Sequence, residues 1–424
     1  MATAIQAHPY HWSTIGYRSD IEGVTTEKLR EHYKNFFWPN NAEAILVGDF
    51  DTERALAIFD REFGGFKPSP HEIPRVITQE PPQEGERRAV VRRPGTVGIV
   101  MLGYIRPGAL HPDFIPLEVL ANILGEGVNS RLYRALVDKQ IASDVAAFNW
   151  TLRDPYPLLV SATALPGKTH EEVEEAIKKT LYEVAANGVT EQEVRRAQQQ
   201  IEVGAIRSRD GTYPYASSLG ESVASTDWKW FLTYVDQIND VTVADVKRVA
   251  ATYLVPEHAT VGWFVPASGP AKTAEAPAPS PTGRRWSREA GPDEGRAAIA
   301  PPAPTKTSFA ARTARKVLKN GIVVDVIENH SVPTVAIRGL VFAGDSSSPA
   351  GVPAVADLTA RMLQRGTKTR TKEEIGALLD NAGATRAYSS NLFETNISLN
   401  GLSRDLPLLL GVLADELKNP AFSE

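Results

Sequence analysis

A stretch that occurs twice in the chain, 217 positions apart, most limits how this sequence can fold. Residues 24–42 return without a gap as residues 241–259. In each copy a threonine stands ahead of apolar residues at helical spacing and a proline follows them, which predicts an N-capped helix that ends before the proline. Both copies then run into a short apolar segment typical of a buried strand. A repeat of this length exceeds the period of solenoid proteins and indicates a duplicated domain.

The composition is that of a globular protein with roughly two to three domains. The 424 residues contain 42% hydrophobic and 23% charged residues, which is an ordinary balance for a chain with well-formed cores. The net charge of -5 provides no basic surface for nucleic acid or anionic lipid. No apolar run is long enough to cross a bilayer. We therefore expect no nucleic-acid partner and no membrane span.

The lack of cysteine excludes several chemistries at once. With 0 cysteines the chain can form no disulfide, no thiolate nucleophile and no cysteine–zinc site, and both the cytoplasm and the periplasm stay open. The first residues lack a basic end followed by an apolar core, so no signal peptide is predicted. We expect a soluble protein of the periplasm or the cytoplasm.

The first half of the chain divides into three segments. Residues 1–66 are predicted to form helix, strand and helix, with the strand at 44–47. Residues 67–93 are polar and rich in proline, which is typical of a connector between domains. Residues 94–266 form a second domain of strands and helices, which the second copy of the repeat completes.

The second half contains a tether and a third folded segment. Nine of the 30 prolines lie between Pro266 and Pro304, so residues 267–312 are predicted to be extended or disordered. Residues 313–424 begin with a hairpin around Asn320-Gly321, and a further strand follows it.

Two short motifs suggest binding sites, but simpler interpretations are favoured. His8 and His11 have the spacing of two metal ligands on one helix face. Pro9 opposes that helix and no carboxylate stands at ligand spacing, so we interpret this segment as a loop without a metal of its own. Gly125 and Gly127 form a Gly-x-Gly that follows a helix instead of a strand, which indicates a helix end and turn, not a nucleotide site.

Three stretches together resemble the pitrilysin or insulinase family of zinc metallopeptidases, the inverzincins. They are the turn Gly125-x-Gly127-x-x-Ser130-Arg131-Leu132, the strand opening Leu318-x-Asn320-Gly321, and the helix and strand of residues 25–48. The resemblance implies an α+β fold of repeated domains, each a mostly antiparallel sheet packed with helices. Two halves of two such domains would close like a clamshell on extended peptides. Residues 1–66 would be the end of a first domain, 94–266 a second, and 313–424 the beginning of a third.

The chain departs from the family at its catalytic motif. The resemblance implies His-x-x-Glu-His on a helix, with two histidines on zinc and the glutamate as general base. Here that helix is predicted at 352–366, and the motif positions hold Asp357, Ala360 and Arg361. Arginine has no lone pair for a metal, and alanine cannot accept a proton. We therefore expect no catalytic residue and no metal ligand in this chain, and regard these three positions as a degenerate motif.

The residues at the motif positions have a structural interpretation. Asp357 and Arg361 stand at i and i+4, where an acceptor and a donor stabilise a helix by about 0.2–0.5 kcal/mol. The family's substrate-gripping Arg and Tyr correspond to Val137 and Ser143. The substrate-binding residues are therefore unknown.

The resemblance gives an expectation for the whole protein. We expect an internal fragment of a zinc-dependent endopeptidase, with an intact motif in an upstream domain and a fourth domain downstream. Zinc would then belong to the complete protein and not to this chain alone, and its partners would be peptide substrates and the other half or subunit of the clamshell. Two alternatives stay open: a noncatalytic peptidase-like scaffold or subunit, and an unrelated α+β binding protein.

Overall fold

The computed structural model describes most of the chain, namely residues 1–267, 313–349, 352 and 354–422. The chain forms two units, of which one contains residues 1–267 with 333–424 and the other residues 268–332. All but the first residue of the expected tether, 267–312, lies outside the described residues, and Ala267 itself ends a strand.

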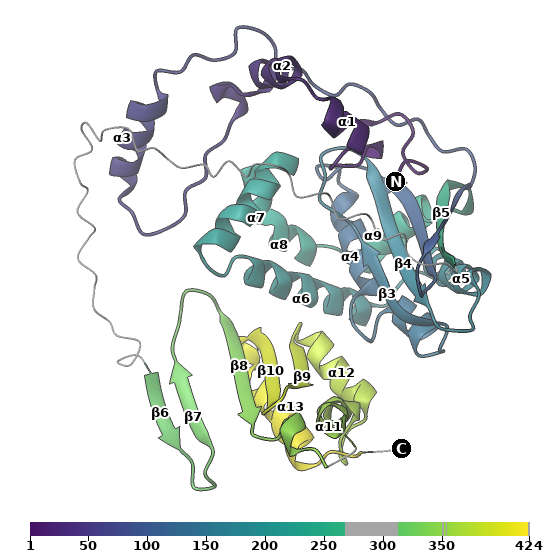
Figure 1. Ribbon diagram of the computed structural model, residues 1–424, viewed down its shortest axis with the longest axis vertical. Coiled ribbons are helices and arrows are strands. Elements are labelled where there is room, and N and C mark those ends of the chain that lie inside the picture. Colours follow the sequence, from purple (N-terminus) through teal and green to yellow (C-terminus); the bar gives the residue numbers. More distant parts are fainter. Residues whose placement is uncertain (268–312, 350–351, 353, 423–424) are drawn as a thin grey trace. The chain divides into compact units, whose positions relative to one another are not determined.

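The second domain is built on one sheet with the strand order β1-β5-β2-β4-β3 (Figure 1). The strands are β1 (Arg87–Pro94), β2 (Ile99–Arg106), β3 (Ala142–Phe148), β4 (Tyr156–Ala164) and β5 (Ala259–Ala267). Neighbouring strands are antiparallel except β1 and β5, which run parallel. In the middle strand, Leu102 pairs with Val160 of β4 and Val261 of β5, and all three side chains are buried. This mostly antiparallel sheet packed with helices confirms the predicted α+β class.

Six helices accompany this sheet. They are α4 (Phe114–Gly125), α5 (His170–Asn187), α6 (Glu191–Ser208), α7 (Thr212–Ser225), α8 (Trp228–Asn239) and α9 (Val243–Tyr253). Thr169, Thr190 and Thr242 each cap a helix in a capping box, which satisfies backbone N–H groups that the first turn leaves free. Helix α9 packs on both α4 and α5, and each of the three helices contacts a strand. The domain core lies between these helices and the sheet.

The sheet begins earlier in the sequence than predicted. Residues 87–93, which we assigned to the connector, form most of strand β1. The strand is rich in arginine, and its alternating pattern was therefore not visible as an apolar run. Arg88 donates from Nη1 to Oε2 of Glu174 at 2.7 Å, so a contact distant in sequence holds this polar edge strand. Helices α7 and α8 were also missed, because Gly, Ser and Pro interrupt the helical pattern of α7.

The N-terminal segment contains helices but no strand. Its helices are α1 (Arg18–Gly23), α2 (Thr26–Phe36) and α3 (Thr52–Phe63). Helices α2 and α3 agree with the prediction, but neither contains a buried residue. The strand predicted at 44–47 is wrong, because the structure has extended chain without strand pairing there. A strand needs a neighbour for its backbone hydrogen bonds, and local sequence cannot supply one.

The third folded segment contains a smaller sheet with the order β8-β10-β9, antiparallel throughout. Its elements are β8 (Thr334–Val341), α11 (Val355–Met362), α12 (Lys372–Asn381), β9 (Thr385–Ser390), β10 (Thr395–Leu402) and α13 (Leu406–Lys418). Its core joins Ile375 and Leu379 of α12, Leu399 of β10, and Leu409 of α13. The strand predicted after the hairpin is β8 and is thus confirmed.

The described residues of the second unit contain a hairpin. Strands β6 (Thr313–Val317) and β7 (Val323–Ile327) pair antiparallel, as predicted from Asn320-Gly321. Gly321 has φ +89°, a conformation that glycine adopts without strain.

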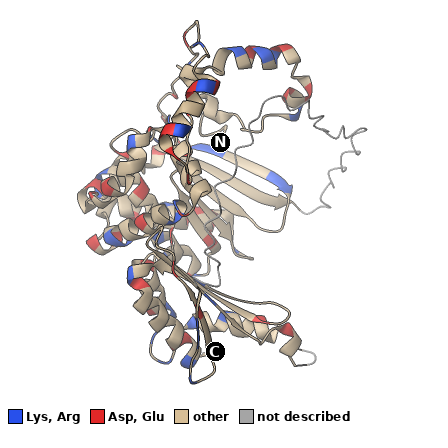
Figure 2. Cartoon of the chain, turned by 90° about the vertical axis from the view of Figure 1, so that its left-hand side faces the viewer, with Lys and Arg blue, Asp and Glu red and all other residues tan. Residues whose placement is uncertain are grey.

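Charge of both signs is present on most of the helices. Lys and Arg alternate with Asp and Glu along the helices, while the strands carry few charges apart from the arginines of β1 (Figure 2). Within the residues that the structure describes, no helix is long and apolar enough to cross a membrane.

Candidate functional site

Helix α11 carries the three positions that correspond to the family's catalytic motif. The helix packs on β9 and β10, and the side chain of Ala360 is 0% exposed in the core of the third segment. Asp357 and Arg361 lie on its outer side, where Nε of Arg361 donates to Oδ2 of Asp357 at 2.7 Å. The predicted i, i+4 ion pair is therefore present. Both of its side chains are well exposed, so the pair contributes less than about 1 kcal/mol.

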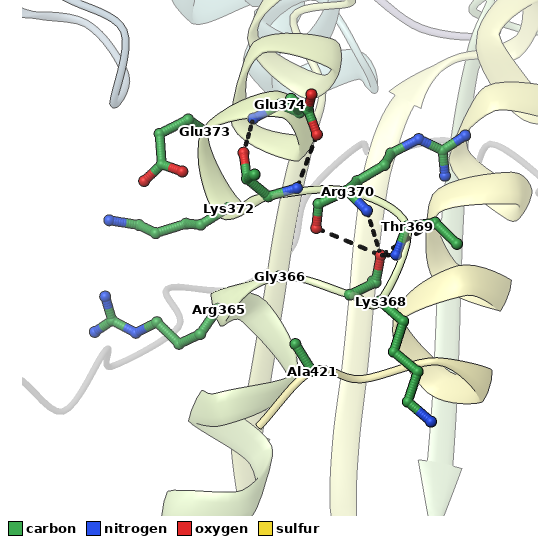
Figure 3. Close-up of a pocket in the computed structure, with 11 residues that line it drawn as sticks. Arg365, Gly366, Lys368, Thr369, Arg370, Lys372, Glu373, Glu374 and Ala421 are labelled. Atoms are coloured by element: carbon green, nitrogen blue, oxygen red, sulfur yellow. Dashed lines mark hydrogen bonds between the residues drawn. The ribbon is translucent and has the colours of Figure 1, made fainter. Parts of the chain in front are cut away.

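A polar pocket lies on the loop that follows α11 (Figure 3). It has a volume of about 490 Å³, and its lining is formed by residues 365–374 and Ala421. Four of the lining side chains are basic, namely Arg365, Lys368, Arg370 and Lys372. Thr371 and Glu374 cap α12 with reciprocal hydrogen bonds, which are drawn in Figure 3. The lining includes neither histidine nor cysteine, so it lacks the side chains that most often transfer protons near neutral pH.

Asp415 of α13 fixes the shape of this loop. Its Oδ2 accepts hydrogen bonds from Thr367 Oγ1 at 2.8 Å, Thr369 Oγ1 at 2.7 Å and Arg370 Nη1 at 2.9 Å. Asn419 donates to its Oδ1 at 2.9 Å. These hydrogen bonds, that from Asn419 first, lower the pKa of Asp415 to about 2. The turn that follows the motif helix is thus anchored to α13 by hydrogen bonds.

The two N-terminal histidines lie in different surroundings. His8 is 4% exposed, and its Nε2 lies 3.5 Å from Oδ2 of Asp154. Its Nδ1 accepts a hydrogen bond from the backbone N–H of Tyr10 at 3.2 Å, at the start of a 3-10 turn, Pro9–His11. The ring of His11 instead packs on Trp12, with 4.2 Å between centroids. The two imidazoles therefore have separate protein neighbours.

The Gly-x-Gly turn ends a helix, as the sequence indicated. Gly125 is the last residue of α4, and Gly127 has φ +76°. Ser130 then accepts a hydrogen bond at Oγ from the N–H of Tyr133, which opens a π-helical turn. Val137 closes that turn, and Ser143 lies in β3, where its hydroxyl donates to the carbonyl of Thr163 at 3.4 Å. Neither position holds an arginine or tyrosine.

A polar cluster beside α4 was missed by the sequence reasoning. Glu118 is the single charged residue of that apolar helix, and this was the signal that could have revealed it. Burial raises the pKa of Glu118 to about 7, although Asn149 Nδ2 donates to its carboxylate at 2.9 Å. Arg106 is 1% exposed, and burial lowers its pKa to about 10. Its guanidinium donates to the carbonyls of Pro107 and Trp150. Most polar atoms of this cluster pair with the protein itself, which is typical of a structural role, while Nε of Arg106 and Oδ1 of Asn149 are buried without a hydrogen-bond partner.

Among the residues that the structure describes, no group of three His, Cys, Asp or Glu side chains could hold a metal ion. The chemistry that the motif positions offer is limited to one carboxylate, already paired with a guanidinium that only donates.

Two family models match the chain. The model described as "Peptidase M16 inactive domain" matches residues 23–201, and the model described as "Insulinase (Peptidase family M16)" matches residues 323–424. The α+β domains described above agree with these matches. Together the two matches cover more than half of the chain, which places it in the insulinase family of peptidases, family M16.

Individual relatives agree with this assignment. The chain is 29% identical to "Zinc protease PqqE" of Helicobacter pylori over 62% of this chain and 60% of that protein. It is 22% identical to "Mitochondrial-processing peptidase subunit beta" of Lentinula edodes over 60% of this chain and 57% of that protein. A crystal structure of a protease from Helicobacter pylori superposes with a TM-score of 0.59 and 29% identity, over 62% of this chain and 65% of that chain. The matched part thus spans about 60% of the length of these curated relatives.

Proposed function

We propose that this chain is the noncatalytic part of an insulinase-type zinc endopeptidase that acts on peptides. The chain forms part of the wall of the peptide chamber and part of the inactive half of the peptidase. The catalytic zinc belongs to a domain outside this chain. One observation carries the proposal. The chain matches the family from the repeat helix α2 into the third segment, yet the motif helix α11 presents Asp357, Ala360 and Arg361 instead of zinc ligands.

The residues on α11 do not fit a zinc ion. Zinc needs three protein donors in a catalytic site, and such donors are imidazole, thiolate or carboxylate groups. Arg361 cannot donate electrons to a metal, and its guanidinium already occupies the carboxylate of Asp357. Ala360 offers no polar atom and faces the apolar core. Any metal chemistry in the complete protein would therefore use residues elsewhere.

The repeat indicates where the catalytic domain would bind. In the second copy, the apolar face of α9 is covered by α4, α5 and strand β2, and Val246 and Val249 are 0% exposed. In the first copy, the same face of α2 is open, with Leu29 58% and Tyr33 61% exposed. Burying such side chains contributes about 25 cal/mol for each Å² of apolar surface. We therefore expect a preceding domain of the same kind to cover α2.

A peptidase assay tests this proposal with three proteins. The first is the chain itself, and the second carries Asp357→His, Ala360→Glu and Arg361→His together. The third joins the chain to an upstream domain with His-x-x-Glu-His and to the remainder of the second half. Only the third should cleave a quenched unstructured peptide, and a chelator should stop it. The triple variant should stay inactive, because ligands act only when neighbouring groups orient them.

The opposite pattern would refute the proposal. Zinc-dependent cleavage by the triple variant alone would place the active site on α11. A joined protein that folds and binds zinc without cleaving peptides would instead favour the second candidate, a noncatalytic scaffold or subunit. That candidate is supported by the similarity to a protein named as a subunit of the mitochondrial processing peptidase. It predicts a stable complex with a separate family member, which size-exclusion chromatography of the mixed proteins would detect.

A further inference from the structure

The Gly-x-Gly turn of the second domain contacts helix α12 of the third segment, within one unit of the structure. Asn129 donates from Nδ2 to Oδ2 of Asp380 at 2.8 Å, across 251 positions of sequence. Helix α6 lies beside the same helix. This contact joins two segments that the sequence alone separates by a proline-rich stretch.

The polar centre of the contact is held in place from the second-domain side. Arg134 donates to Oδ1 of Asn129 at 2.7 Å, which fixes the amide so that its nitrogen points to Asp380. Arg196, 8% exposed, donates to the carbonyl of Asn129 at 3.3 Å. Asn129 itself is 6% exposed. Both hydrogen-bonding ends of this buried amide are therefore used, as buried polar groups require.

Glycines let the two backbones approach around this centre. A Cβ on Gly127 would lie 3.0 Å from the Asp380 carboxylate oxygens. A Cβ on Gly376 would lie 2.7 Å from Cγ2 of Val128. A side chain at Gly376 would therefore fit only if Val128 also changed, since contacts below 3 Å are not tolerated in packed proteins. The surfaces thus fit each other in shape as well as in charge.

Further contacts surround the centre. Lys372 lies over the ring of Tyr133, with its Nζ 5.9 Å from the ring centroid. Nη1 of Arg404 lies 3.7 Å from Oε1 of Glu202. A buried centre within a polar rim is the usual plan of a specific protein interface.

We propose that residues 125–130 together with α6 form a docking surface for α12, which is where the third segment binds the second domain. Because α12 covers the Gly-x-Gly turn, this turn is closed to peptide. The proposal is independent of whether the complete protein cleaves peptides.

A disulfide tests the docking, since the chain has 0 cysteines and offers a clean background. Cγ2 of Val128 is one bond from its Cβ, so the double variant Val128→Cys, Gly376→Cys brings two Cβ atoms within the roughly 4.5 Å that a disulfide needs. The matched control pairs Val128→Cys with Asn381→Cys, because Asn381 is exposed and lies about 140° around the helix from Gly376. Mild oxidation should close an intramolecular loop in the first variant, seen as faster migration without reductant, and leave the control open.

The polar centre is tested by adding Asp380→Ala to the cysteine pair. Loss of a charged hydrogen bond that leaves the Asn129 amide unpaired should slow disulfide formation about tenfold. Circular dichroism checks that the variant stays folded. Equal rates in the cysteine pair and its control would overturn the proposal. A disulfide that forms only between two chains would also overturn it, because the surface would then bind a second copy.

Discussion

Helices α2 and α9 are two copies of one sequence pattern with different surroundings. Both begin after a capping threonine: Thr25 accepts from the N–H of Lys28 at 3.4 Å, and Thr242 from that of Asp245 at 3.2 Å. At aligned positions, however, Leu29 is 58% exposed and Val246 is 0% exposed. The local sequence is therefore sufficient for the helix, while burial depends on what packs against it.

The segments after the two helices extend this comparison. Residues 44–47 form no strand, whereas the corresponding segment after α9 begins β5, which lies between β1 and β2. An apolar run becomes a strand only where neighbouring strands take its backbone hydrogen bonds. On our account, residues 44–47 of the first copy can also form a strand, and they require a neighbouring domain that supplies the pairing strand.

The largest expected difference between the copies comes from placing a charge at aligned positions. Val246→Asp would bury a carboxylate without a partner and should lower the free energy of unfolding by about 3 kcal/mol or more. Leu29→Asp should change it by less than about 0.5 kcal/mol, because that side chain is exposed. Urea unfolding followed by tryptophan fluorescence measures both. Equal losses would mean that α2 is buried in solution and would break the comparison.

A second expected difference is a dependence of stability on pH, which should affect α9 but not α2. The pKa of Glu118 on α4, which packs on α9, is raised by burial from 4.5 to about 7. The carboxyl group of Glu118 loses its proton more easily in the unfolded chain than in the folded one. Its contribution to the free energy of unfolding is therefore full below pH 4.5 and is lost as the pH rises through 7. We expect a loss on the order of 2 to 3 kcal/mol, because each unit of pKa shift corresponds to about 1.4 kcal/mol.

Glu118→Gln is the variant that isolates this effect, since it keeps the shape of the side chain without the charge. Thermal unfolding between pH 4.5 and 8 should show a smaller decline for the variant than for the parent chain. Amide protection of α9 should follow the pH in the parent, while that of α2 should not. An unchanged pH slope in the variant would assign the decline to other groups.

The smallest difference comes from the caps. Thr242→Ala removes a capping box and should cost about 1 kcal/mol of unfolding free energy. Thr25→Ala should lower only the helix content of its own segment, because α2 has no buried residue through which to affect the core. Circular dichroism and urea unfolding of the two variants separate these outcomes. A similar loss of global stability in both would show that the first copy is coupled to the core.

These results explain how much could be predicted from sequence. The helices with strong periodicity and capping residues were predicted, and so was the hairpin at Asn320-Gly321, because turns and caps are local. Strand β1 was not predicted, since Arg88 is held by Glu174, which is remote in sequence. The Glu118 cluster was also missed, because Asn149 comes from another part of the chain. For the motif helix, the ion pair of Asp357 and Arg361 was predictable from spacing, but the burial of Ala360 required the packed fold.

Hydrogen exchange of α2 before and after joining an upstream insulinase-type domain tests the central claim most directly. In the chain alone, the amides of α9 should be strongly protected and those of α2 weakly protected, because stable protection requires packing. In the joined protein, the protection of α2 should rise toward that of α9. If α2 stays unprotected in a joined protein that folds and binds zinc, its apolar face does not receive that domain and the account is wrong.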